Sequence, residues 1–344
     1  MQKIVVIGGS AGSIEALKVI LGGLQPDFAA AVLVVTHIGA RDSILPSLLE
    51  RCTPLPVRHA IHGEPILAGR VLLAPADLHL TVARDGERAY VRLHHGPKEN
   101  HSRPAIDPLF RSAAAAYRAD AIAVVLSGYL DDGTVGLQAI KACNGIAVVQ
   151  DPAEAAAPDM PASALQYTAV DFVRPASDIA STLVELVHRT GAVAVPPAGP
   201  AAKELQERVA IENRMFDEGA DMSEMDRIGT RASMTCPECG GAIWQVRQAS
   251  PVRYRCHTGH AFTARVLESL QDGETEEALW AAVRALHEQE QLYRQLYQTS
   301  GGQRKGAQGA GDPRDEYLTK AERARQQAQV LRELITERMR IGMV

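Results

Sequence analysis

A serine, a histidine and an aspartate each follow a short apolar run of the kind that forms a buried strand. The sequence around Ser10 is Gly-Gly-Ser-Ala-Gly, which fits G-x-S-x-G, the pattern of an exposed nucleophilic serine between a strand and a helix. His37 follows the run 31–36, and Asp132 lies just past the run 121–126. Together these side chains can catalyse acyl transfer, because the serine attacks a carbonyl, the histidine carries the proton and the acid orients the imidazole.

Other interpretations exist for each residue taken alone. A dinucleotide-binding loop would need glycine where Ser10 stands and an acidic residue at the end of a second strand, and both are missing. The loop could also be an ordinary turn, His37 could cap a strand end, and Asp132 could order a turn. The convergence of all three favours catalysis. The amides after Ser10, beginning with Ala11, open a predicted helix and could stabilise an oxyanion.

Apolar strands alternate with helical patterns through the first half of the chain. The predicted strands are 3–7, 31–36, 71–74, 121–126 and 146–150, and the predicted helices are 13–21, 107–118, 134–143, 160–167 and 176–190. This alternation predicts an α/β fold with a doubly wound, mostly parallel, Rossmann-like sheet. Residues that follow parallel strands meet at one edge of the sheet, so Ser10, His37 and Asp132 can converge. The runs 80–83 and 90–93 predict an antiparallel hairpin added to that sheet.

Composition excludes several classes of protein. The chain has 344 residues, of which 36 are basic and 41 acidic, and only 4% are aromatic. A net charge of −5 argues against a nucleic-acid partner, which would need excess Lys and Arg or stacking aromatics. No apolar run approaches the roughly 20 residues that insert into a membrane, and no signal peptide precedes the first strand. With five cysteines, an odd number, a secreted disulfide framework is not expected, so we expect a cytoplasmic protein.

Four potential metal ligands stand in the second half. Cys236 and Cys239 form a C-x2-C pair, and Cys256 and His260 follow as C-x3-H, with His257 as the alternative fourth ligand. Two ligand pairs at this spacing predict a structural zinc ribbon, in which the metal would supply much of the folding free energy. A redox pair or cysteines that fill a small core are the alternatives. We expect no cofactor for catalysis.

The rest of the chain is predicted to form a linker, helices and ribbon strands, with two buried cysteines. A Pro- and Gly-rich stretch at 191–202 predicts a linker, and hydrophobic runs at 242–244 and 252–254 predict ribbon strands. The predicted parts are 1–190 (catalytic domain), 191–233 (linker and a helical segment at 202–216), 234–263 (zinc ribbon) and 264–344 (helical hairpin). We expect Cys52 and Cys143 to be buried thiols within helices.

Two long polar helices, 274–299 and 314–340, are predicted to pair in antiparallel fashion across a Gly-rich loop after Ser300. Their predicted apolar stripe consists of Leu279, Val283, Leu286, Leu292 and Leu296 in one helix and Leu318, Ala321, Ala328, Leu331 and Leu334 in the other. Such a stripe can dock a partner helix or a second copy of the chain, so a homo-oligomer is one expectation.

The segments that carry the predicted site resemble the catalytic domain of CheB-type chemotaxis protein-glutamate methylesterases. The resemblance covers about residues 1–190 and rests on the segments 7–17, 35–38, 63–75, 103–110, 126–137, 150–152 and 160–161. It implies a catalytic triad of Ser10, His37 and Asp132. It also implies hydrolysis of glutamate γ-methyl esters on chemoreceptor helices, with release of methanol, and often deamidation of glutamine. The implied partner is a methylated chemoreceptor or another signalling protein.

Four positions depart from the family pattern. Ala11 replaces a threonine, and Tyr129 stands at a methionine position whose backbone amide the family uses in its oxyanion hole. Leu130 replaces glycine and Asp131 replaces asparagine, which predicts a changed loop and added negative charge beside the triad. The chain begins with the catalytic strand, so we expect no receiver domain in front of it.

The second half also bears on function. The ribbon and helix pair resemble the C-terminal extension of some stand-alone CheB-like proteins. The alternative function is a catalytically weak regulatory protein of a chemosensory system, which would use the cleft and the zinc–helix arm for binding. A nicotinamide-dependent enzyme is disfavoured by the loop around Ser10.

Overall fold

The computed structural model describes residues 2–37, 44–189, 200–218, 222–300 and 315–341. These residues form two compact units, 1–267 and 268–344. Most of the predicted linker 191–202 and the Gly-rich segment after Ser300 lie outside the described residues. Within the described ranges, no helix is both long enough and apolar enough to cross a membrane.

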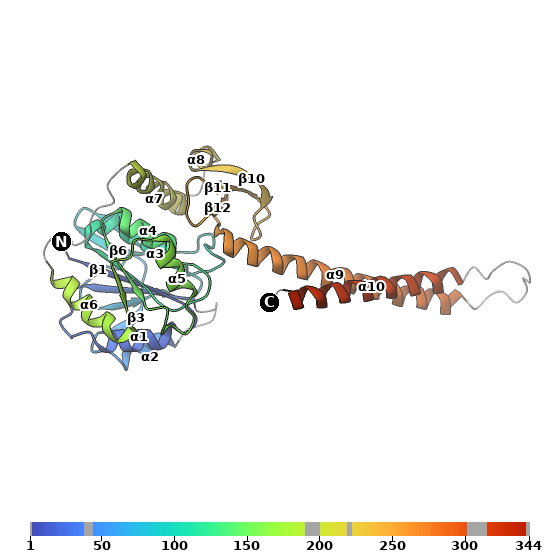
Figure 1. Cartoon of the computed structure of the whole chain (residues 1–344), viewed down its shortest axis with the longest axis horizontal. Helices are drawn as coiled ribbons and strands as arrows, with labels where there is room; N and C mark the ends of the chain where they lie inside the picture. Colours follow the sequence, from blue (N-terminus) through green and yellow to red (C-terminus); the bar gives the residue numbers. More distant parts are fainter. Residues whose placement is uncertain (1, 38–43, 190–199, 219–221, 301–314, 342–344) are drawn as a thin grey trace, which may run out of the picture. The chain divides into compact units, whose positions relative to one another are not determined.

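A seven-stranded sheet forms the centre of the first unit (Figure 1). Its strands, in the spatial order β3-β4-β2-β1-β7-β8-β9, all pair in parallel. Their bounds are β1 Ile4–Gly9, β2 Ala31–Thr36, β3 Val57–His59, β4 Val71–Leu73, β7 Ala121–Val125, β8 Ile146–Gln150 and β9 Phe172–Arg174. Strands β2, β3 and β4 lie on one side of β1, and β7, β8 and β9 follow on its other side, so the strand order reverses between β1 and β7. This arrangement confirms the predicted doubly wound α/β fold.

Helices cover both faces of this sheet. They are α1 Ser13–Gly22, α2 Leu45–Glu50, α3 Ile106–Tyr117, the short 3-10 helix η1 Arg118–Asp120, α4 Thr134–Ala142, α5 Asp159–Tyr167 and α6 Ala176–His188. Leu17 and Ile20 of α1 pack with Leu183 of α6 in one buried core, while Phe110 of α3 packs with Ile140 of α4 in the other. Each fully buried side chain of this kind stabilises the fold by about 1.5–3 kcal/mol.

The predicted antiparallel hairpin exists, but its predicted place in the sheet is wrong. Strands β5 (His79–Asp85) and β6 (Arg88–His94) form a two-stranded sheet of their own. Leu80 and Val82 of β5 are buried in the same core as Leu109 of α3, and Val82 N donates to Ser112 Oγ of α3 at 3.0 Å. The apolar face of the hairpin is therefore buried against a helix and not at an edge of the main sheet.

The cysteine-bearing segment forms a second small sheet with two helices before it. Helices α7 (Pro200–Glu218) and α8 (Met222–Ile228) precede four antiparallel strands. These strands are β10 Gly229–Thr235, β11 Ala242–Val246, β12 Arg253–Cys256 and β13 Ala261–Thr263. The predicted runs lie mainly in β11 and β12, and β10 and β13 flank them. Trp244 is fully buried with Met215 and Met225, so this sheet, called the ribbon below, has one compact aromatic core.

Two long helices end the chain, α9 (Ala264–Thr299) and α10 (Asp315–Ile341). Helix α9 begins ten residues before the predicted start at 274. Thr263 explains the earlier start, because its Oγ1 accepts a hydrogen bond from Val266 N at 3.2 Å and so caps the first turn.

Within the second unit, α9 and α10 run side by side and antiparallel (Figure 1), and Glu290 faces Arg325 while Arg294 faces Glu322. Part of the predicted stripe is wrong, because Leu292, Leu318 and Leu334 are exposed. Among the residues of α10 whose side chains are described, the buried ones are Ala321, Ala324, Ala328 and Ile335. Alanine is small enough to bring the two helices close, which moves the contact face away from these leucines.

Two cysteines outside the ribbon lie just past helix ends. Cys143 follows α4 and is buried, as expected, while Cys52 follows α2 and is half-buried. Both are free thiols, and burial raises the pKa of Cys143.

Candidate active site

Ser10 stands in a tight turn between β1 and α1. Its backbone N–H donates to Ser127 O at 2.8 Å, and its carbonyl accepts from Ser13 N at 3.1 Å and from Ser13 Oγ at 2.7 Å. Gly12, the residue before α1, has φ 76°, a left-handed conformation that glycine adopts without strain. The turn thus fixes the serine backbone where the buried strand ends.

The loop after β7 passes close to this serine. A Cβ atom added to Gly128 would lie 2.9 Å from Ser10 Cβ and 2.1 Å from Met160 Sδ, so only glycine fits there. Ser127 Oγ also donates to Ala11 O at 2.7 Å. Loops that are more than a hundred residues apart in sequence are therefore tied together around Ser10.

His37 follows β2 at the same edge of the sheet. Gly9 pairs with Thr36 in the parallel register of β1 and β2, so Ser10 and His37 are the next residues along strands that lie about 4.8 Å apart. His37 N donates to Gly9 O at 3.4 Å, and its Nε2 lies 2.8 Å from Asp132 Oδ2. Among the described residues, neither His37 Nδ1 nor Ser10 Oγ makes a hydrogen bond, so the structure brings the two residues to neighbouring positions without a hydrogen bond between their side chains.

Asp132 is buried and accepts hydrogen bonds at both carboxylate oxygens. Oδ2 accepts from His37 and from Ile106 N at 2.7 Å, and Oδ1 accepts from Asn100 Nδ2 at 2.9 Å. Asp107 N and Gly133 N complete the set at 3.3 and 3.0 Å. Burial alone would raise the pKa of Asp132, but the hydrogen bonds outweigh burial and hold that pKa below its ordinary value. Asp132 is thus ionised and fixed, as the acid of a triad must be.

Two other carboxyl groups lie next to Asp132. Burial raises the pKa of Asp107 to about 7, and the charge of Asp132 adds to that effect. Burial also raises the pKa of Asp131 to about 6, against a hydrogen bond from Thr263 Oγ1 at 2.8 Å. Of the three neighbouring acids, Asp132 is therefore the one that carries its charge most readily.

The two candidate oxyanion amides belong to Ala11 and Tyr129. In the described part of the chain, neither amide N–H has a hydrogen-bond acceptor, and the Tyr129 side chain is 65% exposed. Leu130, where the family pattern has glycine, adopts φ 64°, so the leucine keeps a backbone conformation that glycine favours. A change of this loop relative to the family stays a prediction.

Several residues around Asp132 escaped the sequence interpretation. Asn100 and Thr263 contact the acidic residues. Asn100 lies within the polar run 98–103 and Thr263 ends a three-residue strand, so neither residue stands out in the sequence. Asp107 lies within the segment 103–110, whose resemblance to the family was the only signal for it.

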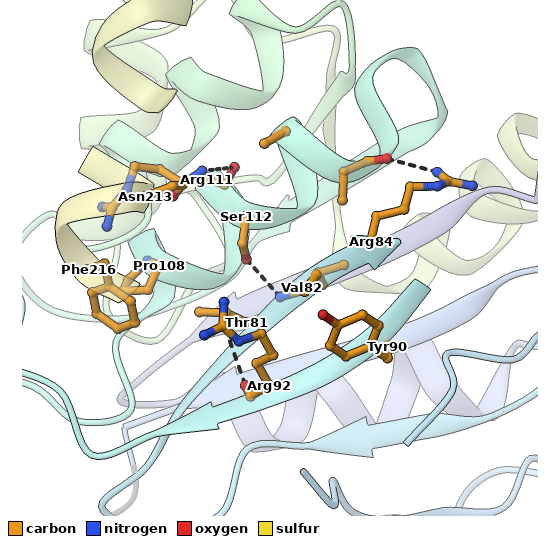
Figure 2. A pocket seen from close by; sticks show the side chains of 13 residues that line it. Thr81, Val82, Arg84, Tyr90, Arg92, Pro108, Arg111, Ser112, Asn213 and Phe216 are labelled. Carbon is orange, nitrogen blue, oxygen red and sulfur yellow. Dashed lines mark hydrogen bonds between the residues drawn. The ribbon is translucent and has the colours of Figure 1, made fainter. Parts of the chain in front are cut away.

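A cavity in the first unit lies apart from the three candidate residues. It has a volume of about 400 Å³ and lies between the β5–β6 hairpin, α3 and α7 (Figure 2). Arg84 Nη1 donates to Ala116 O at 2.8 Å, and Ser112 Oγ accepts from Val82 N, so these lining side chains already serve the fold. Ser10, His37 and Asp132 are not among the lining residues.

Comparison with known proteins places this site in a family. The model of the CheB methylesterase family matches residues 5–183, which include all three candidate residues. The chain belongs to the CheB methylesterase family.

Relatives of known sequence and structure agree with this assignment. A relative from Leptospira interrogans is 39% identical over 183 residues, which are 53% of this chain and 93% of the relative. "Protein-glutamate methylesterase/protein-glutamine glutaminase 2" from Anaeromyxobacter dehalogenans is 41% identical over 187 residues, and the match spans about half of each chain (54%). The crystal structure of the Thermotoga maritima CheB methylesterase catalytic domain matches with a TM-score of 0.53 and 34% identity, over 54% of this chain and 99% of that one.

The ribbon lies beyond the residues that match the CheB methylesterase family and contains a cluster that could hold a metal ion. One ligand atom from each of Cys236, Cys239, Cys256 and His260 lies within 4.8 Å of the others. Cys239 Sγ and Cys256 Sγ are 4.0 Å apart, and His260 Nδ1 lies 3.5 Å from Cys256 Sγ. Ligands of a tetrahedral zinc with Zn–S bonds of about 2.3 Å are separated by similar distances.

The alternative ligand, His257, lies outside this cluster. Its Nδ1 is 3.4 Å from Ala242 O, and its ring would contact a Cβ atom on Gly241 at 2.3 Å. His257 thus packs against the turn before β11, and His260 is the histidine that faces the three thiols.

Proposed function

We propose that the chain is a serine hydrolase that removes methyl esters from glutamate side chains of chemoreceptor-like proteins and also deamidates glutamine. The names of the relatives, protein-glutamate methylesterase and protein-glutamine glutaminase, support this reaction class. The observation that carries the proposal is the bond between His37 Nε2 and the buried Asp132 carboxylate, one register position from Ser10.

In the proposed mechanism, Ser10 Oγ attacks the ester carbonyl while His37 Nδ1 takes its proton. The Asp132 carboxylate stabilises the imidazolium that forms. The amides of Ala11 and Tyr129 would donate to the developing oxyanion, where two free donors supply much of the rate enhancement. Collapse of the tetrahedral intermediate releases methanol, which takes the proton from His37, and leaves an acyl ester on Ser10.

Water completes the cycle. His37 removes a proton from the water as it attacks the acyl ester, and Ser10 regains its proton when the free glutamate leaves. With glutamine as substrate, the same steps release ammonia in place of methanol. The products in both cases are a glutamate side chain and an unchanged enzyme.

The experiment that tests this function measures methanol released from a methylated receptor fragment. We expect Ser10→Ala to lower the rate by about 10⁶-fold, because triad residues act as a unit. Ser177→Ala, at an exposed serine of α6, is the matched control and should keep full activity. A Ser10→Ala protein that still releases methanol would show another nucleophile, and a wild type without turnover would favour the regulatory alternative.

We also propose that the ribbon binds one structural zinc through Cys236, Cys239, Cys256 and His260. The mixed thiolate and imidazole donor set supports zinc, and the three free thiols of the cluster fit the cytoplasm, where thiols stay reduced. When bound, the ion would cross-link the turns of the ribbon. It would take no part in ester hydrolysis.

We infer the same four parts that the sequence predicts, namely 1–190 for catalysis, 191–233 as connector, 234–263 for metal binding and 264–344 as a helical hairpin. Self-association through the helical hairpin of α9 and α10 is supported by three exposed leucines, Leu292, Leu318 and Leu334. The substrate partner would be a methylated chemoreceptor or a related signalling protein.

A further inference from the structure

The ribbon lies directly against the loop that carries Asn100. Asn100 N donates to Ala261 O of β13 at 2.8 Å, and Ala261 N donates to Lys98 O at 3.4 Å. Glu99 also forms a parallel bridge with Ala261. Strand β13 of the ribbon is therefore joined to the catalytic domain by backbone hydrogen bonds.

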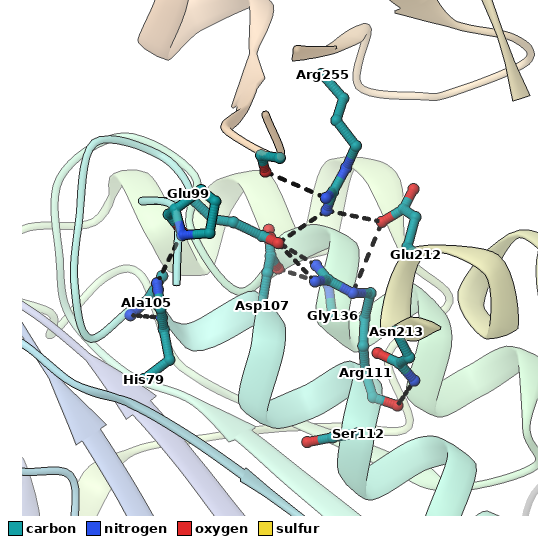
Figure 3. Close-up of polar contacts among 12 residues, drawn as sticks. His79, Glu99, Ala105, Asp107, Arg111, Ser112, Gly136, Glu212, Asn213 and Arg255 are labelled. Carbon is teal, nitrogen blue, oxygen red and sulfur yellow. Dashed lines mark hydrogen bonds and ion pairs between the residues drawn. The ribbon is translucent and has the colours of Figure 1, made fainter. Parts of the chain in front are cut away.

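A buried ion-pair network fixes this contact (Figure 3). Arg255 Nη2 of β12 lies 2.8 Å from Glu99 Oε1, and Arg111 of α3 binds both oxygens of Glu99 at 2.7 Å. Arg253 of β12 binds Glu212 of α7 at 2.9 Å. All five side chains are at most 4% exposed, so each charge depends on its partners and the ribbon is held in one position.

Asn100 connects the ribbon to the catalytic acid Asp132 by hydrogen bonds. Its Nδ2 donates to Asp132 Oδ1 at 2.9 Å and to Asp107 Oδ2 at 3.0 Å, while its Oδ1 accepts from Thr263 N at 3.2 Å. An amide has donors at one end and an acceptor at the other. The backbone N–H of Thr263 in the ribbon thus holds the oxygen, which turns the NH2 group toward the two carboxylates.

Thr263 makes a second contact with the acidic cluster. Its Oγ1 donates to Asp131 Oδ1 at 2.8 Å while it accepts from Val266 N, and the side chain is nearly fully buried. One residue of the ribbon therefore binds Asp131 directly and reaches Asp132 through Asn100.

We propose that the ribbon is a working part of the esterase site, in which Asn100 and Thr263 are positioning residues for Asp132 and Asp131. The catalytic part of this inference rests on the proposed function. Cys256 ends β12 and His260 precedes β13, so a metal on the cluster would hold the two strands from which Arg255 and Thr263 reach the catalytic loop. Occupancy of the metal site is thereby coupled to the geometry of the triad.

Asn100→Gly tests the first positioning residue, with Asn144→Gly as the matched control. Both asparagines have left-handed backbones, with φ of 50° and 66°, where glycine is tolerated. Asn144 lies in the turn before β8, at the opposite edge of the sheet. Loss of a hydrogen bond to a charged group predicts a kcat lower by roughly ten- to a hundredfold with KM unchanged, whereas the control should match the wild type.

Thr263→Val and Thr263→Ser test the second residue. Valine keeps the shape and removes both hydroxyl bonds, so we expect a kcat about tenfold lower. Serine keeps the hydroxyl and should restore kcat. Thr230→Val, at an exposed threonine of β10, controls for a general effect on the ribbon. This pair also keeps the proposal testable if Asn100→Gly does not fold.

A carboxyl titration separates positioning from mere stability. ¹³C NMR of labelled aspartate in the full chain gives the pKa of Asp132, assigned through Asp132→Asn. The titratable groups around Asp132 are His37, His79, Asp107 and Asp131. None of them is replaced in Asn100→Gly, although Asp107 also loses its hydrogen bond from Asn100. Because Asn100 donates to the carboxylate, its loss should raise that pKa and move the acidic limb of the kcat profile to higher pH. Removing the metal with a chelator should shift the pKa in the same direction.

The possible outcomes distinguish the two proposals. A raised Asp132 pKa in Asn100→Gly, with Asn144→Gly unchanged, supports the positioning role even if the wild type releases no methanol, in which case only the proposed function fails. An active wild type whose Asn100→Gly and Thr263→Val variants keep both kcat and the Asp132 pKa would overturn the positioning role.

Discussion

At the scale of single residues, three neighbouring carboxyl groups differ because their hydrogen-bond donors differ. Asp132 accepts from His37, Asn100 and three backbone amides, while Asp131 accepts from Thr263 alone among the described residues. Equal chemistry in unequal surroundings gives unequal pKa values, which is how active sites divide roles among identical side chains.

Asp131→Asn should stabilise the protein at neutral pH. Burial raises the pKa of Asp131 to about 6 in the folded state from an ordinary 3.8, so the unfolded chain loses this proton first as pH rises. Wild-type stability therefore falls between about pH 4 and pH 6, and the cost is fully present above pH 6. Asparagine avoids this cost and can still accept from Thr263, so we expect the free energy of unfolding at pH 7.5 to rise by about 3 kcal/mol.

Urea unfolding at pH 3.5 and pH 7.5 measures the difference. The gain should nearly vanish at pH 3.5, where Asp131 is protonated in the folded state and mostly protonated in the unfolded chain. Asp85→Asn, at an exposed position of β5, should show no gain at either pH. Equal stability of Asp131→Asn and the wild type at pH 7.5 would contradict the assigned environment of Asp131.

At the scale of elements, the strands next to the candidate residues could be predicted and the contacts between distant loops could not. The apolar runs before Ser10, His37 and Asp132 are continuous because parallel strands are buried on both faces. Asn100 and Thr263 are 163 residues apart, and no periodic pattern links a loop to a three-residue strand. The hairpin was misplaced because alternation shows which face is buried but not which element covers it.

Glu99→Gln should destabilise the contact between the ribbon and the catalytic domain. Glu99 binds Arg111 and Arg255, and the charges of Arg111 and Arg255 hold its pKa far below the ordinary value in spite of burial. Loss of its charge leaves two buried guanidinium groups short of a partner, which costs about 3–5 kcal/mol. Urea unfolding should show this loss, while Glu87→Gln at the exposed tip of the β5–β6 hairpin should change little. A loss below about 1 kcal/mol would contradict the importance of the network.

At the scale of the whole molecule, the ribbon belongs to the same compact unit as the family domain, although the family match ends at residue 183. The spacing of Cys236, Cys239, Cys256 and His260 predicted a metal site, because tetrahedral ligands come in short-range pairs. The contact between the ribbon and the catalytic loop could not be predicted in this way. It depends on buried Arg–Glu pairs, which cannot be distinguished from surface charges in a sequence.

Metal removal should loosen the ribbon before the α/β domain. We expect one zinc per full-length chain by elemental analysis, and Cys236→Ser should lose it while Cys52→Ser, outside the cluster, keeps it. After chelation, limited proteolysis should cut within 229–263 and spare 5–183, because so small a sheet depends on its metal for stability. A metal-free protein whose ribbon resists protease as well as the wild type would contradict a structural zinc.

In the proposed mechanism, Ser10 is a nucleophile that His37 activates. Peptide mapping by mass spectrometry after treatment with diisopropyl fluorophosphate tests it directly, because this reagent modifies serines that a neighbouring base activates. We expect a single adduct on Ser10 in the wild type and almost none in His37→Ala. An adduct on a different serine, or equal labelling of Ser10 in His37→Ala, would contradict it.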